Sequence, residues 1–96
     1  MAGMNRQITL VCTGVPPNIG ANLAIDVVEE FTHRPWHQNV TCQWDGVNLI
    51  LCAENDWDDN GKALLDEFSD AICANVDGFD GDISIRSITA LSINSN

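Results

Sequence analysis

The sequence predicts an α+β fold, in which strands and two helices pack around one core. Two stretches, 7–13 and 39–52, alternate apolar and polar residues with the period of two that is typical of half-buried strands. Two others, 18–33 and 61–76, repeat apolar residues every three or four positions, as amphipathic helices do. A last alternation begins at Ile83, so strands and helices interleave along the chain.

Length and composition are those of one domain. A chain of 96 residues, 45% of them hydrophobic, supports a single core, which we expect to span 1–96 with frayed ends at 1–6 and 92–96. The sequence shows neither an apolar run of membrane-spanning length nor the apolar segment of a signal peptide. This predicts a cytoplasmic protein with no membrane partner.

Proline and glycine mark the ends of the first two elements. The first strand has one apolar side, formed by Ile8, Leu10 and Cys12. The Gly-Val-Pro-Pro sequence at 14–17 ends this strand, and proline suits the first position of a helix. Gly20 lies on the apolar face of that helix, where it would allow a close approach to a sheet. Pro35 ends the helix, because proline disfavours helical backbone in the residue before it.

Asp45-Gly46, between two alternating runs, predicts a β-hairpin with a two-residue turn. Trp36 and Trp44 are expected in the core or at the edge of this hairpin. Because Cys42 and Cys52 fall on opposite faces, they cannot form a disulfide. All four cysteines lie in apolar patterns without a C-x-x-C motif, which favours buried free thiols. Pairing outward from the turn puts one apolar set on a single face: Trp44 with Val47, Cys42 with Leu49, and Val40 with Leu51.

The remaining elements complete a known architecture. A loop of helix-capping residues at 55–60 precedes the second helix, and a turn at 77–81 leads to the last strand. The phase of that strand shifts near Ser87-Ile88, as a β-bulge would produce. The order strand, helix, strand, strand, helix, strand predicts a ferredoxin-like βαββαβ sandwich. In it, a four-stranded antiparallel sheet carries both helices on one face.

Negative charge is concentrated in one third of the chain. The net charge is −10, and residues 54–82 hold ten of the fourteen carboxylates against the single cation Lys62. Asp59, Asp66 and Asp70 share the outward face of the second helix by their spacing. Nucleic acid and anionic lipid would repel this surface, so we expect no direct nucleic-acid partner.

The acidic loop also fits a metal-binding pattern. Residues 56–67 match D-x-[DN]-x-[DN]-G-x₅-E and resemble an EF-hand loop, which implies calcium ligands at Asp56, Asp58, Asn60 and Glu67. The match departs from the EF-hand because a strand, not a helix, is predicted before it, and because Leu64 stands at the ninth position. The alternative is a helix-capping loop without a cofactor.

Signatures of catalysis are incomplete. The sequence has no glycine-rich phosphate loop, no G-x-S-x-G motif and no Cys-His pair with an orienting group, so we expect no enzymatic activity. The open face of the sheet lacks the aromatic platform of RNA-binding proteins with this architecture. One alternative is therefore a homodimeric regulatory or ligand-binding subunit that uses this open face, which would be formed by Thr9, Val11, Thr13, Thr41, Gln43 and Ile50.

These observations favour a small acidic protein that binds and inhibits a partner. Its acidic helix and loop would dock on a basic surface of another protein, such as a nucleic-acid-binding site, in the manner of a DNA mimic. Trp57 would be the anchor. In size and charge the chain is similar to phage anti-restriction and anti-CRISPR proteins and to toxin-neutralising immunity proteins, although no motif carries the similarity. The partner-binding residues would be Asp56, Trp57, Asp58, Asp59, Asp66, Glu67 and Asp70.

Overall fold

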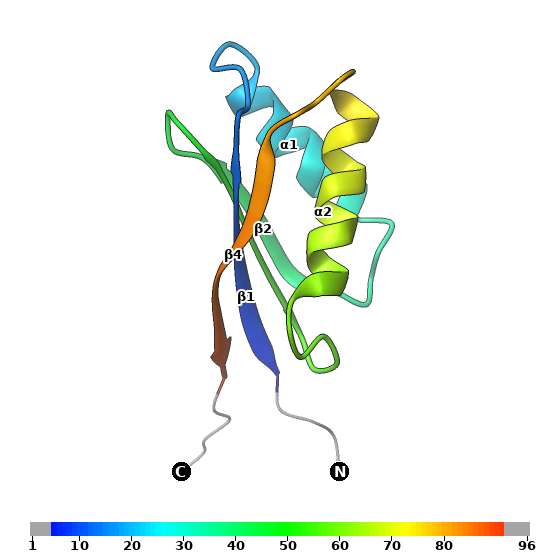
Figure 1. The fold of residues 1–96 in the computed structure, drawn as a ribbon. Coiled ribbons are helices and arrows are strands. Elements are labelled where there is room, and N and C mark those ends of the chain that lie inside the picture. Colours follow the sequence, from blue (N-terminus) through cyan, green and yellow to red (C-terminus); the bar gives the residue numbers. More distant parts are fainter. Residues whose placement is uncertain (1–4, 92–96) are drawn as a thin grey trace.

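The structure, a computed structural model, describes residues 5–91. The strands form one antiparallel sheet in the order β2-β3-β1-β4, and both helices cover the same face of it (Figure 1). This confirms the predicted ferredoxin-like architecture. The elements are β1 (Arg6–Thr13), α1 (Gly20–Phe31), β2 (Gln38–Trp44), β3 (Leu49–Asn55), α2 (Lys62–Asn75) and β4 (Asp82–Ala90).

Most of the predicted frayed termini cannot be compared with the structure, but Arg6 can. Residues 1–4 and 92–96 lie outside the described residues. Arg6, which we expected in a frayed end, instead opens β1, where it pairs with Asn55 of β3 and Ala90 of β4. Among residues 5–91, no helix is both long and apolar enough to cross a membrane.

The core lies between the sheet and the two helices. Gly20 confirms its predicted role, because a Cβ at this position would collide with the indole of Trp44. The glycine therefore lets α1 begin directly against β2. The buried apolar residues of this core are Ile8, Leu10, Cys12, Val15, Leu23, Ala24, Val27, Phe31, Leu49, Leu51, Ala53, Leu64, Phe68, Ala71 and Ile72.

The β2–β3 turn corrects the predicted hairpin. Trp44 pairs with Leu49, so the connection has four residues, Asp45–Asn48, and the predicted two-residue turn is wrong. The Asp45 carboxylate accepts the backbone N–H groups of Val47 (2.8 Å) and Asn48 (2.6 Å), which stabilises the longer turn. These hydrogen bonds lower the pKa of Asp45. The register moves by two residues, so the predicted faces remain correct, although Val47 is 71% exposed.

The predicted bulge in the last strand is present one residue earlier. Leu10 of β1 pairs with Ile85 and Thr9 pairs with Ser87, which leaves Arg86 of β4 as the additional residue. On the open face of the sheet, the β1–β3 register places Thr9 opposite Cys52 and Val11 opposite Ile50.

All four cysteines are free, but they differ in exposure. Cys73 lies exposed on α2, so its prediction as a buried thiol is wrong. Burial raises the pKa of Cys12 to about 11 and that of Cys42 to about 12, from 9.0. Both thiols therefore stay protonated at neutral pH.

Alkaline pH should destabilise the fold through these thiols. The pKa of Cys42 is 9.0 when unfolded and about 12 when folded, so its contribution to stability is complete below pH 9 and declines as the pH rises toward 12. The chain contains no tyrosine, which would titrate in the same range. Denaturant unfolding at pH 7 to 11 should show this decline, and Cys42→Ala should reduce it to the part that Cys12 contributes. Cys73→Ala should leave it unchanged; an equal effect of both substitutions would contradict the assignment to Cys42.

Candidate functional site

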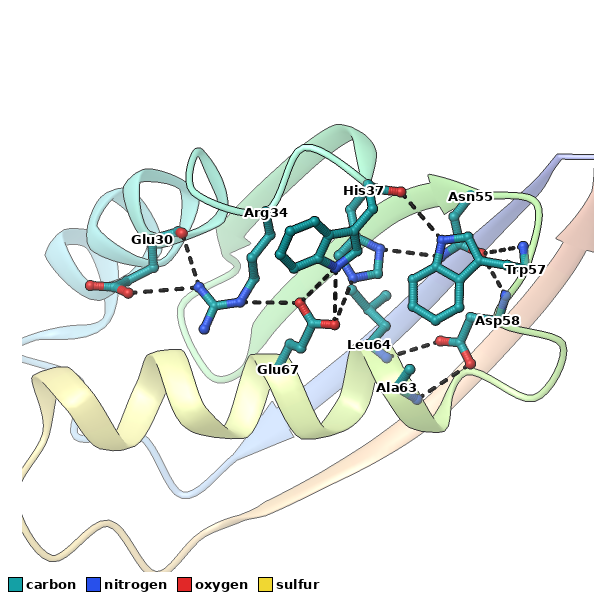
Figure 2. A network of polar contacts seen from close by, with 10 residues as sticks. Glu30, Arg34, His37, Asn55, Trp57, Asp58, Ala63, Leu64 and Glu67 are labelled. Carbon is teal, nitrogen blue, oxygen red and sulfur yellow. Dashed lines mark hydrogen bonds and ion pairs between the residues drawn. The ribbon is translucent and has the colours of Figure 1, made fainter.

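Three segments that are distant in the sequence converge beside the N-terminal half of α2 (Figure 2). They are the α1–β2 connection, the end of β3 with the loop that follows it, and one side chain of α2. We call this group the loop cluster: Arg34, Trp36, His37, Asn55, Trp57, Asp58 and Glu67.

Asn55 is the buried centre of the loop cluster. Its Oδ1 accepts the backbone N–H groups of Trp57 (3.1 Å) and Asp58 (2.8 Å), which fixes the loop after β3. Because Oδ1 already serves two donors, the amide Nδ2 faces His37 and donates to its Nδ1, 3.2 Å away. The proton of the imidazole is then on Nε2.

Glu67 of α2 closes the cluster from the helix side. Its carboxylate pairs with Arg34 Nε at 3.1 Å and accepts the indole N–H of Trp36 at 3.2 Å. His37 Nε2 lies 3.2 Å from Glu67 Oε2, but without the alignment of a hydrogen bond. Glu67 was predicted to bind a partner, but its carboxylate points inward. It faces Arg34, Trp36 and His37, which all belong to the α1–β2 connection.

Asp58 is also engaged inside the protein. It is buried, and its two carboxylate oxygens accept the backbone N–H groups of Ala63 (3.3 Å) and Leu64 (2.9 Å) in the first turn of α2. A carboxylate at this position satisfies donors that have no partner within the helix and interacts favourably with the helix dipole. The structure thus supports the helix-capping interpretation of this loop.

Two tryptophans of the cluster remain half exposed although they are held in place. Trp36 is 49% exposed and Trp57 is 45% exposed. The indole N–H of Trp57 points to the carbonyl oxygen of Trp36, 3.4 Å away, and its ring lies 5.4 Å from that of His37. The expectation that Trp36 belongs to the core or the hairpin edge is wrong, whereas Trp44 packs against the core. The position of Trp36 between Pro35 and His37, outside any apolar alternation, was the available indication.

The other predicted partner-binding residues are exposed. Asp56 lies in the loop, and Asp66 and Asp70 lie on the outward side of α2; within residues 5–91, none of the three forms an ion pair. Asp59 pairs with Arg6 at 3.0 Å, but its side chain is largely in solvent, where such a pair contributes little. The outward charge thus comes from fewer residues than the sequence suggested.

A cleft of about 250 Å³ adds acidic surface that sequence reasoning had missed. It lies between α1 and the C-terminal end of α2, and all three of its carboxylates come from α1. Its lining residues are Asp26, Glu29, Glu30, Thr32, His33 and Asn75.

Three of the four predicted calcium ligands, Asp58, Asn60 and Glu67, have other partners in the structure. Within the described part of the chain, no group of three or more His, Cys, Asp or Glu side chains could hold a metal ion. Asp58 caps α2, Glu67 pairs with Arg34, and Asn60 Oδ1 accepts the backbone N–H of Lys62 at 3.0 Å. Calcium binding at 56–67 would therefore require at least two carboxylates to exchange their present partners.

A calcium titration tests this prediction directly. We expect millimolar calcium to leave the melting temperature unchanged and to release no heat in calorimetry, because the helix cap and the Arg34–Glu67 pair would have to break. Magnesium at the same ionic strength is the control. A saturable rise in melting temperature with calcium alone would contradict this expectation and support the EF-hand-like loop.

The loop cluster is better suited to binding than to proton transfer. The side chain of His37 is 0% exposed, and each ring nitrogen faces a side chain of the protein. A general base must lie within hydrogen-bond reach of its substrate. The imidazole of His37 has no exposed surface for such a contact. What the cluster offers to solvent is the surface of two fixed indoles.

Comparison with protein-family models, with curated proteins and with solved structures found no match to this chain.

Proposed function

We propose that this protein is a non-catalytic binding protein that inhibits a partner by docking on a basic surface, such as the nucleic-acid-binding site of another protein. The observation that carries the proposal is the pair Trp36 and Trp57, which are about half exposed yet fixed by hydrogen bonds. We define the docking face as these two tryptophans together with Asp56, Asp66 and Asp70.

The docking face combines the two features that a guanidinium group requires. An indole face attracts a cation through its quadrupole, and arginine also stacks on it as a planar group. Carboxylates nearby accept the N–H groups of the same guanidinium. Because the loop cluster already fixes Trp36 and Trp57, little conformational entropy is lost when a partner binds them. An arginine-rich surface therefore suits this face better than a lysine-rich one.

The spacing of the charges favours a discrete basic patch over a complete phosphate track. DNA presents a phosphate about every 3.4 Å along each strand, whereas successive outward residues on a helix four positions apart are separated by about 6 Å. With Asp58 and Glu67 engaged inside the protein, the acidic surface is sparser than the sequence suggested. The proposed inhibition therefore rests on covering the basic site rather than on copying the DNA backbone.

An arginine peptide provides a probe that requires no knowledge of the natural partner. We expect nona-arginine to bind with a change in tryptophan fluorescence, and Trp57→Ala to weaken this binding about three- to fivefold, as expected for an exposed cation–π contact. The stability of the variant should change little, since Trp57 lies at the surface. Val47→Ala, at an exposed apolar residue outside the docking face, is the matched control. Equal binding by wild type and Trp57→Ala would contradict the proposed anchor.

Inhibition requires a separate experiment. Proteins captured from a lysate on the wild-type chain, but not on the Trp57→Ala and Asp66→Lys/Asp70→Lys variants, would be purified and tested for nucleic-acid binding. We expect the protein to compete with a DNA or RNA duplex for such a partner. Simultaneous binding of the duplex and this protein would argue against an inhibitor of nucleic-acid binding.

A further inference from the structure

The edge strand β4 has no partner on its outer side within residues 5–91. It runs along the border of the sheet and pairs only with β1 (Figure 1). Most of its residues are exposed, including Ile85 and Ile88 at 36% each. An edge with unpaired N–H and C=O groups is a template for another strand, and proteins usually protect it with proline, lysine or inward charges. β4 contains no proline or lysine, and Arg86 is the only charge within it after Asp82.

The opposite edge is less suitable for pairing. The β2–β3 register is interrupted between Gln38 and Thr41, and Asn39 there has a positive φ of 50°. An irregular edge of this kind disfavours strand addition. β4 also carries a bulge, at Arg86, but the segment Asp82–Ile85 before that bulge pairs with β1 without interruption.

The sequence of β4 is complementary to itself in one antiparallel register. If Ser84 lies opposite Ser84 of a second copy, Ile83 faces Ile85 and Asp82 faces Arg86, each contact occurring twice by symmetry. Pairing with β1 shows that Ile83 and Ile85 lie on the helix side of the sheet, whereas Asp82 and Ser84 lie on the open side. The register therefore matches like faces from Asp82 to Ile85, and it brings Asp82 of each copy to the bulge residue Arg86 of the other, which has the opposite charge. Centring the pair on Arg86 would instead oppose two arginines.

We propose that β4 pairs with β4 of a second copy of this chain around a twofold axis at Ser84, which joins the two sheets into one. Asp82 and Arg86 are free for this role, since neither forms an ion pair among the described residues. The paired segment is short, so the dimer should be weak and dependent on concentration. The dimer would carry two copies of the docking face, but its formation does not depend on the proposed function.

Sedimentation velocity from low to high micromolar concentration tests the dimer. Physiological salt is used, because a net charge of −10 on each chain otherwise opposes association. We expect the mass to rise from 10.5 kDa toward twice that value. A constant monomer mass at the highest concentration would overturn the proposal.

Charge exchange tests the register. Arg86→Asp and Asp82→Arg should each weaken association by about tenfold or more, because each opposes like charges twice in the dimer. The double variant Asp82→Arg/Arg86→Asp should return to within about threefold of wild type, since it restores both pairs in reverse. Thr41→Lys, on the β2 edge, is the control and should leave association unchanged. A dimer that Thr41→Lys disrupts, or that the double variant fails to restore, would place the contact elsewhere and overturn the proposal.

Cross-linking at the twofold axis gives a second measurement that does not depend on charge. In a Cys73→Ser background, Ser84→Cys should form a disulfide-linked dimer under mild oxidation, because directly opposite residues in antiparallel strands have Cβ atoms about 4.5–5.5 Å apart. Gln43→Cys, on the β2 edge and opposite Ile50, should remain largely monomeric in the same background. Equal cross-linking of both variants would overturn the β4 register.

Discussion

Asn55→Ala is expected to lower the free energy of unfolding by about 3 kcal/mol, the largest change we expect from a single polar substitution in this protein. The amide of Asn55 is buried and satisfies two backbone N–H groups and one nitrogen of His37. Alanine removes the amide, so these three groups lose their hydrogen-bond partner. Each unsatisfied buried group costs about 1–3 kcal/mol of stability, although water and local relaxation would recover part of that sum. Urea denaturation of the two proteins measures the difference.

A second asparagine provides the control for this prediction. Asn75 is the last residue of α2, is exposed, and makes a single side-chain hydrogen bond to the carbonyl oxygen of Ala71. Asn75→Ala should change the free energy of unfolding by no more than about 0.5 kcal/mol. The Asn55 variant should also lose the ordered loop that holds Trp57, so its fluorescence response to nona-arginine should weaken. Equal stability of the two variants would show that the loop cluster does not depend on Asn55.

Reversing the charge of Asp66 and Asp70 is expected to slow association with a basic partner about 10- to 100-fold at low salt. Both carboxylates are exposed on the outward side of α2, and neither forms an ion pair within the described residues. Charges at the rim of an interface act mainly on the rate of encounter, so the difference should shrink as salt rises. Stopped-flow mixing of Asp66→Lys/Asp70→Lys with nona-arginine, followed by tryptophan fluorescence, measures this rate.

A matched variant separates the docking face from net charge. Asp77→Lys/Asp80→Lys changes the net charge by the same amount, but it lies beyond the C-terminal end of α2, about 20 Å along the helix from the loop that holds Trp57. We expect this control to slow association much less. Identical rates for the two variants would mean that only total charge matters, and the proposed face would lose its support. Melting temperatures of both variants should stay close to that of wild type, since all four side chains are exposed.

The fold could be predicted from the sequence because periodicity decides which face of an element is buried. The alternation in 7–13 and the helical spacing in 61–76 each have one buried side, and the structure places these sides against a single core. The same reasoning placed Asp66 and Asp70 on the outside of α2. It failed for the β2–β3 turn, because a shift of two residues leaves every face unchanged. The hydrogen bonds of Asp45 determine the four-residue connection, and alternation contains no information about them.

The sequence by itself determined the architecture, the outward acidic side of α2 and the presence of a tryptophan in the acidic loop. Only the tertiary structure decided which carboxylates are free. Neither residue type nor local sequence pattern distinguishes Asp58 and Glu67 from Asp56 and Asp66. The first pair is nevertheless engaged inside the protein, whereas the second pair is exposed. For Glu67 the physical reason is distance along the chain: its partners lie about thirty residues away in the α1–β2 connection, and only folding brings them together.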